Sequence, residues 1–155
     1  MIKNLLYWIF AIIIIQTLCC NTYASANESA LSYVCDDVIG NNSVSVYISK
    51  LHCKSYFGMV PKGNTEWKCE VVMYYHSGDM KNRGAEYCWM GFDYRLSETP
   101  NVAFIDFKIP YTSYFDKNDK KIGGFNKTTT WMPVRIDSLP DKIFDAMMEV
   151  LTGKR

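Results

Sequence analysis

The chain carries two histidines, His52 and His76, as side chains that could act as bases at neutral pH. His76, Ser77 and Asp79 lie close together and include the residue types of a Ser-His-Asp triad, in which the histidine accepts the serine proton. No G-x-S-x-G segment presents a serine on a sharp turn, and such triads are defined by geometry rather than by spacing. His52 directly precedes Cys53, which suggests a catalytic thiolate beside a histidine. Neighbouring side chains on a strand point to opposite faces, however, so the two would not meet. We therefore predict that the protein is not an enzyme, and keep a small hydrolase as the second alternative.

The acidic residues do not form a recognisable metal or glycosidase site. Asp116 and Asn118 resemble the start of a calcium-binding loop, but Lys120 occupies the fifth position, where a ligand is needed, and no glycine follows it. The 16 Asp and Glu residues are scattered along the chain instead of being paired near one predicted site. A glycine-rich phosphate-binding motif is also missing. The sequence thus predicts neither a metal nor a cofactor.

Cysteine usage points to structural disulfides. Two of the six cysteines fall in an N-terminal segment that we expect to be removed. An even number of remaining cysteines in an exported chain favours two disulfides, and the sequence leaves all three connectivities open. Close pairs of the C-x-x-C type, which zinc sites use, do not occur among them. The predicted disulfide residues are Cys35, Cys53, Cys69 and Cys88.

Aromatic side chains next to charged residues indicate a surface for binding another protein. Aromatic residues make up 15% of the chain, and residues 111–130 form its longest stretch without a periodic pattern, which we expect to be a loop. Exposed aromatic side chains are typical of the residues that dominate protein interfaces. The alternative is that these rings fold back over the sheet. The predicted partner-binding residues come from this loop and from a second loop at 76–84: Tyr111, Tyr114, Phe115, Asp116, Lys120, Ser77 and Asp79.

A small sheet must position these residues. Alternation of apolar and polar residues predicts half-buried strands, which lie at 43–51, 67–75, 85–94 and 102–109, with a fifth at 131–136. Pro133 places the fifth strand at an edge, because proline cannot donate a hydrogen bond to a neighbour. Apolar residues then recur at helical spacing from Ser138, a candidate N-cap, to Gly153, a candidate C-terminal cap. The sequence predicts an α+β domain, with a single antiparallel β-sheet of about five strands and a C-terminal helix, stapled by two disulfides.

The first 26 residues have the pattern of a secretory signal peptide. Lys3 precedes an apolar run over residues 5–18, and Ala24-Ser25-Ala26 resembles a cleavage site. The run is shorter than the roughly 20 residues that a membrane-spanning helix needs, so we expect a mature form that does not span the membrane. An uncleaved anchor and a lipidated cysteine are the alternatives. Residues 27–155 are then predicted to form one disulfide-linked domain that is periplasmic or secreted.

The charge balance excludes one class of partner. The chain has 17 basic and 16 acidic residues and a net charge of +1, and loss of Lys3 with the signal peptide would leave no net charge. Proteins that bind nucleic acids usually carry a strongly basic surface. We therefore expect no nucleic-acid partner.

One short segment is similar to a known family. Residues 33–36, Tyr-Val-Cys-Asp, followed by an alternating strand, resemble the opening of the periplasmic C-type lysozyme inhibitors, which are small disulfide-linked β-barrels. The inhibitory Ser-Gly-x-x-Tyr pattern of that family is half met, since Ser77 and Gly78 are present but Lys81 occupies the tyrosine position. The predicted C-terminal helix is foreign to the family. By analogy, the resemblance implies an inhibitor in the cell envelope.

Together these patterns predict an exported, non-enzymatic binding protein. Its expected action is to neutralise or occlude a partner protein in the cell envelope, as an immunity protein or a lysozyme inhibitor does, and that partner is expected to be a toxin or a lytic enzyme. A rigid sheet would lower the ordering cost of such binding. The alternative is a structural or accessory subunit of an envelope or surface assembly.

Overall fold

The chain divides into two units, Met1–Leu31 and Ser32–Arg155, and the second contains all of the described strands except the first residue of β1. A computed structural model describes the following residues: 30–56, 66–97, 104–126 and 130–155. The predicted signal peptide, residues 1–26, lies outside the described residues. The same is true of the first residues of the predicted fourth strand.

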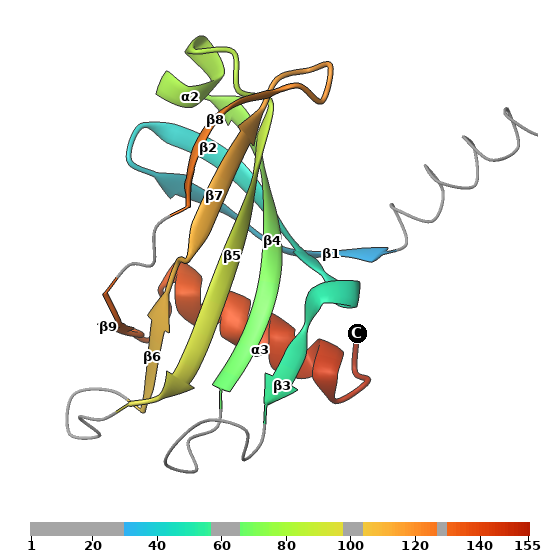
Figure 1. Ribbon diagram of the computed structural model, residues 1–155, viewed down its shortest axis with the longest axis vertical. Coiled ribbons are helices and arrows are strands. Elements are labelled where there is room, and N and C mark those ends of the chain that lie inside the picture. The colour runs from blue at the N-terminus through green and yellow to red at the C-terminus, as the bar shows by residue number, and fades with distance from the viewer. Residues whose placement is uncertain (1–29, 57–65, 98–103, 127–129) are drawn as a thin grey trace, which may run out of the picture. The chain divides into compact units, whose positions relative to one another are not determined.

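The described residues contain nine strands in one sheet, together with three helical segments (Figure 1). The strands are β1 (Leu31–Ile39), β2 (Asn42–Ser49), β3 (Lys54–Tyr56), β4 (Glu66–Ser77), β5 (Tyr87–Leu96), β6 (Ile105–Lys108), β7 (Tyr111–Phe115), β8 (Lys121–Asn126) and β9 (Met132–Pro133). The helical segments are the 3-10 turn η1 (Lys50–His52), the short helix α2 (Asp79–Asn82) and the C-terminal helix α3 (Leu139–Leu151).

The two long strands β4 and β5 form the centre of the sheet, whose main order is β1-β2-β4-β5-β6-β9 (Figure 1). On one side of β4, β3 pairs with its first residues and β2 with the later ones. On the far side of β5, β7 pairs with its first half and β6 with its second half. β8 extends the sheet beyond β7. Each long strand therefore positions the side chains of two shorter neighbours.

The predicted antiparallel sheet with a C-terminal helix is confirmed, but the predicted strand number is too low. The patterns at 43–51, 67–75 and 85–94 correspond to β2, β4 and β5, and the described part of 102–109 contains β6. The edge strand expected at 131–136 is reduced to Met132–Pro133. The strands that alternation did not predict are β1, β3, β7 and β8.

The stretch expected to be one long loop is the β7–β8 hairpin. Its turn is held by Asp116, whose Oδ1 accepts hydrogen bonds from the backbone N–H groups of Asn118 at 2.8 Å and Lys120 at 3.0 Å. Asp119 adopts a left-handed conformation with φ of 60°, which Asp tolerates better than most residues. The charged run is therefore turn chemistry between two strands, rather than evidence of an irregular loop.

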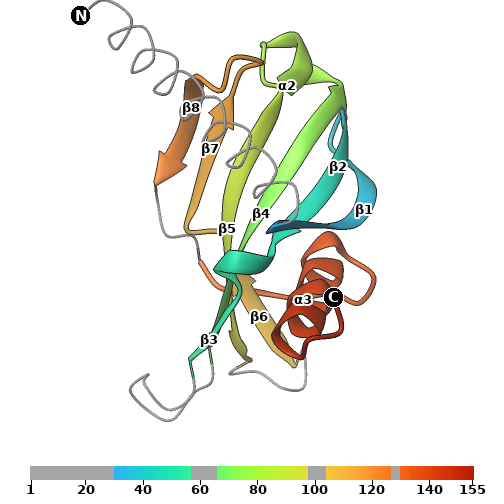
Figure 2. The same ribbon diagram turned by 90° about the vertical axis from the view of Figure 1, so that its right-hand side faces the viewer.

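The sheet has two faces of different character. On the inner face, α3 covers the sheet, and the inward residues of β4 include Cys69, Val71 and Met73, each nearly fully buried. The outer face carries the alternate residues. No described α-helix lies over it, and the 3-10 turn η1 contacts it through His52. Figure 2 shows α3 against one side of the sheet only. Burial of one face by α3 is the reason why the strands alternate between apolar and polar residues.

The helix α3 begins and ends close to the predicted residues. Ser138 is the N-cap, although its Oγ donates to the carbonyl of Arg135 and not to the first turn of the helix. The side chains of Ile143 and Met147 are fully buried against the sheet. Gly153 follows the helix with φ of 72° and donates to the carbonyl of Val150, as a C-terminal cap does.

The two predicted disulfides are not formed, since the four cysteines in the described part of the chain are all thiols. The strand register explains this for the most obvious pairs. Cys69 and Cys88 lie on adjacent strands, but Cys69 is opposite Phe92 and Cys88 is opposite Met73, an offset of about 13 Å along the strands. Cys35 lies on β1, which β2 separates from β4. A disulfide needs Cα atoms within about 7 Å, so these pairings are excluded.

Candidate functional site

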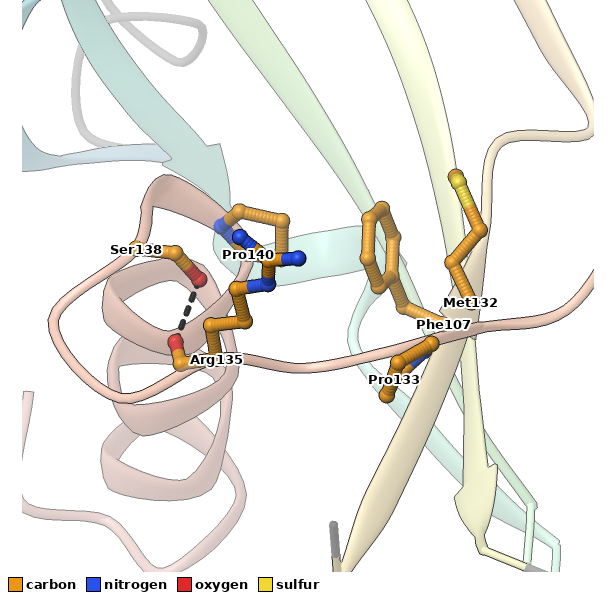
Figure 3. A pocket seen from close by; sticks show the side chains of 6 residues that line it. All are labelled: Phe107, Met132, Pro133, Arg135, Ser138 and Pro140. Atoms are coloured by element: carbon orange, nitrogen blue, oxygen red, sulfur yellow. Dashed lines mark hydrogen bonds between the residues drawn. The ribbon is translucent and has the colours of Figure 1, made fainter. Parts of the chain in front are cut away.

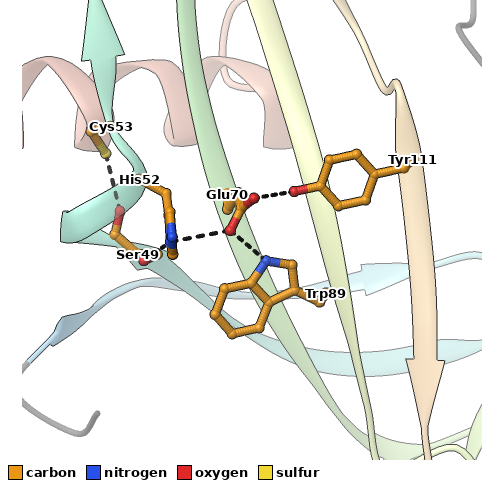
Figure 4. Close-up of polar contacts among 6 residues, drawn as sticks. All are labelled: Ser49, His52, Cys53, Glu70, Trp89 and Tyr111. Carbon is orange, nitrogen blue, oxygen red and sulfur yellow. Dashed lines mark hydrogen bonds and ion pairs between the residues drawn. The ribbon is translucent and has the colours of Figure 1, made fainter. Parts of the chain in front are cut away.

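A polar cluster on the outer face is built around the carboxylate of Glu70 on β4 (Figure 4). Its Oε2 accepts a hydrogen bond from Trp89 Nε1 at 2.7 Å and lies 3.1 Å from His52 Nδ1, while Oε1 accepts from the hydroxyl of Tyr111. His52 Nδ1 is also 2.8 Å from Ser49 Oγ. Glu70 thus has partners from three other elements, which holds β5, β7 and η1 together on one side of the sheet.

Tyr111 reaches Glu70 because a glycine lies between them. Gly91 on β5 is the register partner of Glu70, and a Cβ atom on Gly91 would lie only 2.5 Å from Cε1 of the Tyr111 ring. The ring therefore crosses β5 directly over the backbone of Gly91. Burial, followed by the hydrogen bond to Glu70, raises the pKa of Tyr111, which keeps its hydroxyl protonated and able to donate.

A hollow of about 160 Å³ lies beside this cluster and contains groups of both charges. On its wall, Lys68 Nζ lies 4.0 Å from Asp93 Oδ2 and over the ring of Tyr56. The hollow is smaller than the roughly 300 Å³ at which small-molecule pockets usually begin. Two lysines line it, Lys54 and Lys68. Lys68 already faces Asp93, and the wall also carries the carboxylate of Glu70, so the hollow lacks the surplus of positive charge expected of an anion site.

The second histidine is part of a chain of hydrogen bonds with Ser45 and Asp36. Ser45 Oγ lies 2.6 Å from Asp36 Oδ1 and 2.7 Å from His76 Nε2. The serine hydroxyl donates to the carboxylate and accepts from the imidazole N–H, since a hydroxyl has a single proton. In a catalytic triad the histidine stands between the serine and the acid and removes the serine proton. Here the serine stands in the middle, so His76 does not activate it.

An aromatic row crosses the outer face over five strands. Its members are Tyr33 on β1, Tyr47 on β2, Tyr74 on β4, Tyr87 on β5 and Phe115 on β7. The ring centroids of the first three successive pairs are each 5.6 Å apart, and those of Tyr87 and Phe115 are 4.9 Å apart. These are the separations of directly contacting rings. Strand pairing has brought residues from positions 33 to 115 into one continuous strip.

The rings of the aromatic row are partly accessible and differ in orientation. Tyr33 and Tyr74 retain 48% and 36% of their maximal exposure. Tyr33 and Tyr47 meet at 70° and Tyr47 and Tyr74 at 88°, whereas Tyr87 and Phe115 are nearly parallel at 11°. The Tyr87 hydroxyl donates to Asp119 Oδ1 at 3.0 Å, and burial is the main reason for the rise of its pKa to about 12.

The predicted partner-binding residues are divided between the two faces. Phe115 belongs to the aromatic row and Tyr111 to the Glu70 cluster, but Tyr114 packs against the hydrophobic core on the inner face. Asp116 and Lys120 form the ends of the β7–β8 turn, where the N–H of Asp116 donates to the Lys120 carbonyl.

The predicted residues Ser77 and Asp79 lie at the same end of the sheet. Ser77 ends β4 opposite Ser43, and Asp79 begins α2. His76 contacts Ser45 rather than either of them, so the structure does not bring these three residues together as a triad.

Most of the aromatic row was missed at the level of sequence. Tyr33, Tyr47, Tyr74 and Tyr87 belong to strands, whereas the predicted binding residues lie in segments expected to be loops. One signal was present, because Tyr47 shares the polar face of its strand with Ser45. An aromatic residue at an outward position of several successive strands predicts such a row once the strand order is known.

A separate apolar hollow of about 410 Å³ lies where β9 leads towards α3 (Figure 3). It is lined by Phe107, Met132, Pro133, Arg135, Ser138 and Pro140. The hydroxyl of Ser138 is engaged with the Arg135 carbonyl (Figure 3). Among the described residues that line it, Arg135 alone is charged, and these residues do not supply the convergent polar groups that orient a small ligand.

Comparison with known proteins finds no matching family, no similar curated protein and no similar solved structure. Among the described residues, no group of three or more His, Cys, Asp or Glu side chains could hold a metal ion. Over the same residues, no helix has the length and apolar character needed to cross a membrane. The aromatic row and the Glu70 cluster are therefore the features on which a function must be argued.

Proposed function

We propose that the protein is an exported, non-enzymatic binding protein that neutralises or occludes a partner protein in the cell envelope. The observation that carries the proposal is the aromatic row, which lies on the sheet face opposite the helix α3 (Figure 2). Tyrosine and other aromatic residues are enriched in the centres of protein interfaces. A tyrosine ring supplies a large contact area with few rotatable bonds, and its hydroxyl can hydrogen-bond to the partner.

The geometry of the rings favours a protein over a flat ligand. Tyr33, Tyr47 and Tyr74 meet edge to face, so they present a ridged strip and not a common plane on which a flat molecule could stack. A ridged strip suits the interdigitating side chains of a protein surface. The nearly balanced charge of the chain supports recognition by shape and local polarity more than by a uniform electrostatic field.

The aromatic row stands on a rigid sheet, as expected of a surface that covers a site on a partner protein. Each ring of the aromatic row stands on a strand of one sheet, and the Glu70 cluster fixes the neighbouring η1, β5 and β7. Such a surface has little conformational freedom left to lose when a partner binds, which lowers the ordering cost of association. A rigid strip of this kind would cover a site on a toxin or a lytic enzyme without being altered by it.

The alternative is a structural or accessory subunit of an envelope or surface assembly, which could use the same strip. The two functions differ in what is isolated with the protein. A one-to-one complex with a toxin or lytic enzyme, accompanied by loss of that enzyme's activity, supports an inhibitor. Isolation as a stable complex of several subunits supports the accessory function.

Substitution of Tyr74 in the centre of the aromatic row tests the proposal. Tyr74→Ala should weaken partner binding by about tenfold or more, the cost of truncating a central interface residue. Phe104→Ala is the matched control, because Phe104 is an exposed aromatic residue, 83% accessible, outside the row. The partner is captured from envelope extract with the wild-type protein, and its affinity for each variant is measured by titration. Equal affinity of Tyr74→Ala and wild type would contradict the proposal.

A further inference from the structure

Cys53 and Cys69 come opposite one another where β3 joins β4. In this antiparallel pair, Lys54 is opposite Lys68 and Ser55 is opposite Trp67. One residue further in the same register places Cys53 opposite Cys69. Both cysteines contact the hydrophobic core, on the inner face of the sheet.

The predicted separation of these two residues is compatible with a disulfide. Residues directly opposite in antiparallel strands have Cα atoms about 4.5–5.5 Å apart, and disulfides occur at about 4.4–6.8 Å. The electrostatics agree with this proximity, because the pKa of Cys69 is raised first by burial and next by the neighbouring Cys53. Cys35 and Cys88 also have pKa values raised mainly by burial, but no second cysteine contributes to either.

We propose that Cys53 and Cys69 are an oxidisable pair that forms a disulfide between the start of β3 and β4. In the structure, the Cys53 thiol donates to the carbonyl of Ser49 at 3.3 Å (Figure 4). Rotation about the Cα–Cβ bond of Cys53 exchanges this weak hydrogen bond for approach to the Cys69 sulfur. The inference concerns the chain itself and is independent of the proposed partner.

The oxidant is a small disulfide such as oxidised glutathione. The Cys53 thiolate, which is the less buried of the two, attacks one sulfur of the oxidant, and one glutathione leaves as its thiolate. The Cys69 thiolate then attacks the Cys53 sulfur of the mixed disulfide and releases the second glutathione. Two protein thiols lose two protons and two electrons, and one glutathione disulfide becomes two glutathione thiols. Burial raises the pKa of Cys53 to about 11, so the reaction is slow at neutral pH and faster in alkali.

The bond would also hold the Glu70 cluster in place. His52 directly precedes Cys53, and Glu70 directly follows Cys69. A covalent link between the two cysteines therefore fixes η1 at the point where His52 meets Glu70. Oxidation is expected to stabilise this corner of the sheet without disturbing the aromatic row.

Peptide mapping tests the pairing. The reduced full-length protein is incubated with oxidised glutathione at about pH 9, where more of each thiol is ionised, and the remaining thiols are alkylated. Trypsin then cleaves after Lys50, Lys54, Lys68 and Lys81, so that Cys53 and Cys69 fall in the separate peptides 51–54 and 69–81. Mass spectrometry without reduction should find these two peptides joined, and should find Cys35 and Cys88 outside any link between peptides, either alkylated or carrying one glutathione.

Two variants separate specific pairing from general oxidation. In Cys53→Ser, Cys69 should be recovered alkylated, whereas in Cys35→Ser the 53–69 link should form as in wild type. A link from Cys53 or Cys69 to Cys35 or Cys88 would overturn the proposal. Full alkylation of both Cys53 and Cys69 in wild type after prolonged incubation would overturn it as well.

Discussion

At the scale of single residues, two neighbours on β7 have opposite surroundings. Tyr114 packs against the hydrophobic core of the inner face, and burial raises its pKa. Phe115 lies on the outer face and stacks on Tyr87 with the ring planes 11° apart. Strand geometry alone separates them, because successive side chains point to opposite faces of a sheet. The two residues are adjacent in the sequence, but one supports the sheet and the other lies in the proposed interface.

This difference predicts opposite effects of two alanine substitutions. Tyr114→Ala should lower the free energy of unfolding by about 1–3 kcal/mol, because it removes a partly buried ring from the core, and should leave partner affinity nearly unchanged. Phe115→Ala should reduce partner affinity more than stability. Thermal unfolding and a binding titration on the same samples measure both quantities. If Tyr114→Ala instead reduced partner affinity and Phe115→Ala did not, the interface would lie on the inner face.

The residue types of the site could be foreseen, but their grouping could not. Tyr111 and Phe115 are predicted binding residues because they lie near charged residues in the sequence. Glu70 is one of 16 acidic residues, and no motif or spacing in the sequence distinguishes it from the others. Its partners come from β5, β7 and η1, and only the strand register places them together. Grouping of this kind depends on long-range pairing, which local sequence patterns do not encode.

At the scale of elements, the contact between β4, β5 and β7 depends on the missing side chain of Gly91. We predict that Gly91→Ala displaces the ring of Tyr111 and breaks its hydrogen bond to Glu70, because the new Cβ would lie 2.5 Å from the ring. A ring displaced by overpacking, together with a lost hydrogen bond to a charged group, should cost about 1–3 kcal/mol. Chemical denaturation measures the free energy of unfolding.

Gly123→Ala provides the matched control for this substitution. Gly123 lies on β8, and a Cβ there would meet the Tyr114 ring at 3.7 Å, an ordinary contact. Its stability should therefore stay within about 0.5 kcal/mol of wild type. In a Tyr111→Ala background, Gly91→Ala should lose its effect, since the clashing ring is gone. A full effect of Gly91→Ala in that background would show that the ring is not the cause.

Elements with a strong period were predictable, and those held by turns and pairing were not. The strand β4 alternates along most of its length because α3 buries one of its faces, with Val72 as a buried exception on the other face. The helix α3 itself has buried residues at helical spacing. By contrast, the six residues of β8 are all exposed and include two glycines, so they carry no alternating signal. β8 exists because β7 pairs with it across the turn closed by Asp116.

At the scale of the whole molecule, tyrosines and cysteines form a set of acids that folding keeps protonated. Burial is the main reason why the pKa of Tyr87 rises to about 12 and that of Cys53 to about 11. The pKa values of Tyr75, Tyr94 and Tyr111 are raised too, again mainly by burial. In the unfolded chain these groups would ionise at their ordinary values, near 9 for cysteine and near 10 for tyrosine.

Ionisation of these tyrosines and cysteines should therefore lower the stability of the folded protein in alkali. It should have no effect in mild acid. Above about pH 9 the unfolded chain binds fewer protons than the folded one, so the free energy of unfolding falls as pH rises. A fully buried group such as Tyr94, with no exposed surface, contributes a slope of up to about 1.4 kcal/mol per pH unit. Below the unfolded pKa values the contribution is complete and constant.

Urea unfolding at several pH values between neutrality and the pKa of Tyr87, about 12, measures this dependence. The fall in stability should begin near pH 9, steepen above pH 10 and coincide with the appearance of tyrosinate absorbance. Tyr87→Phe removes one of the titrating groups together with its bond to Asp119, so its curve should fall less steeply between about pH 10 and 12 than that of wild type. Stability that stayed constant up to pH 11 would mean that the buried tyrosines and cysteines ionise in the folded molecule as they do in the unfolded chain, and that the core does not exclude water from them.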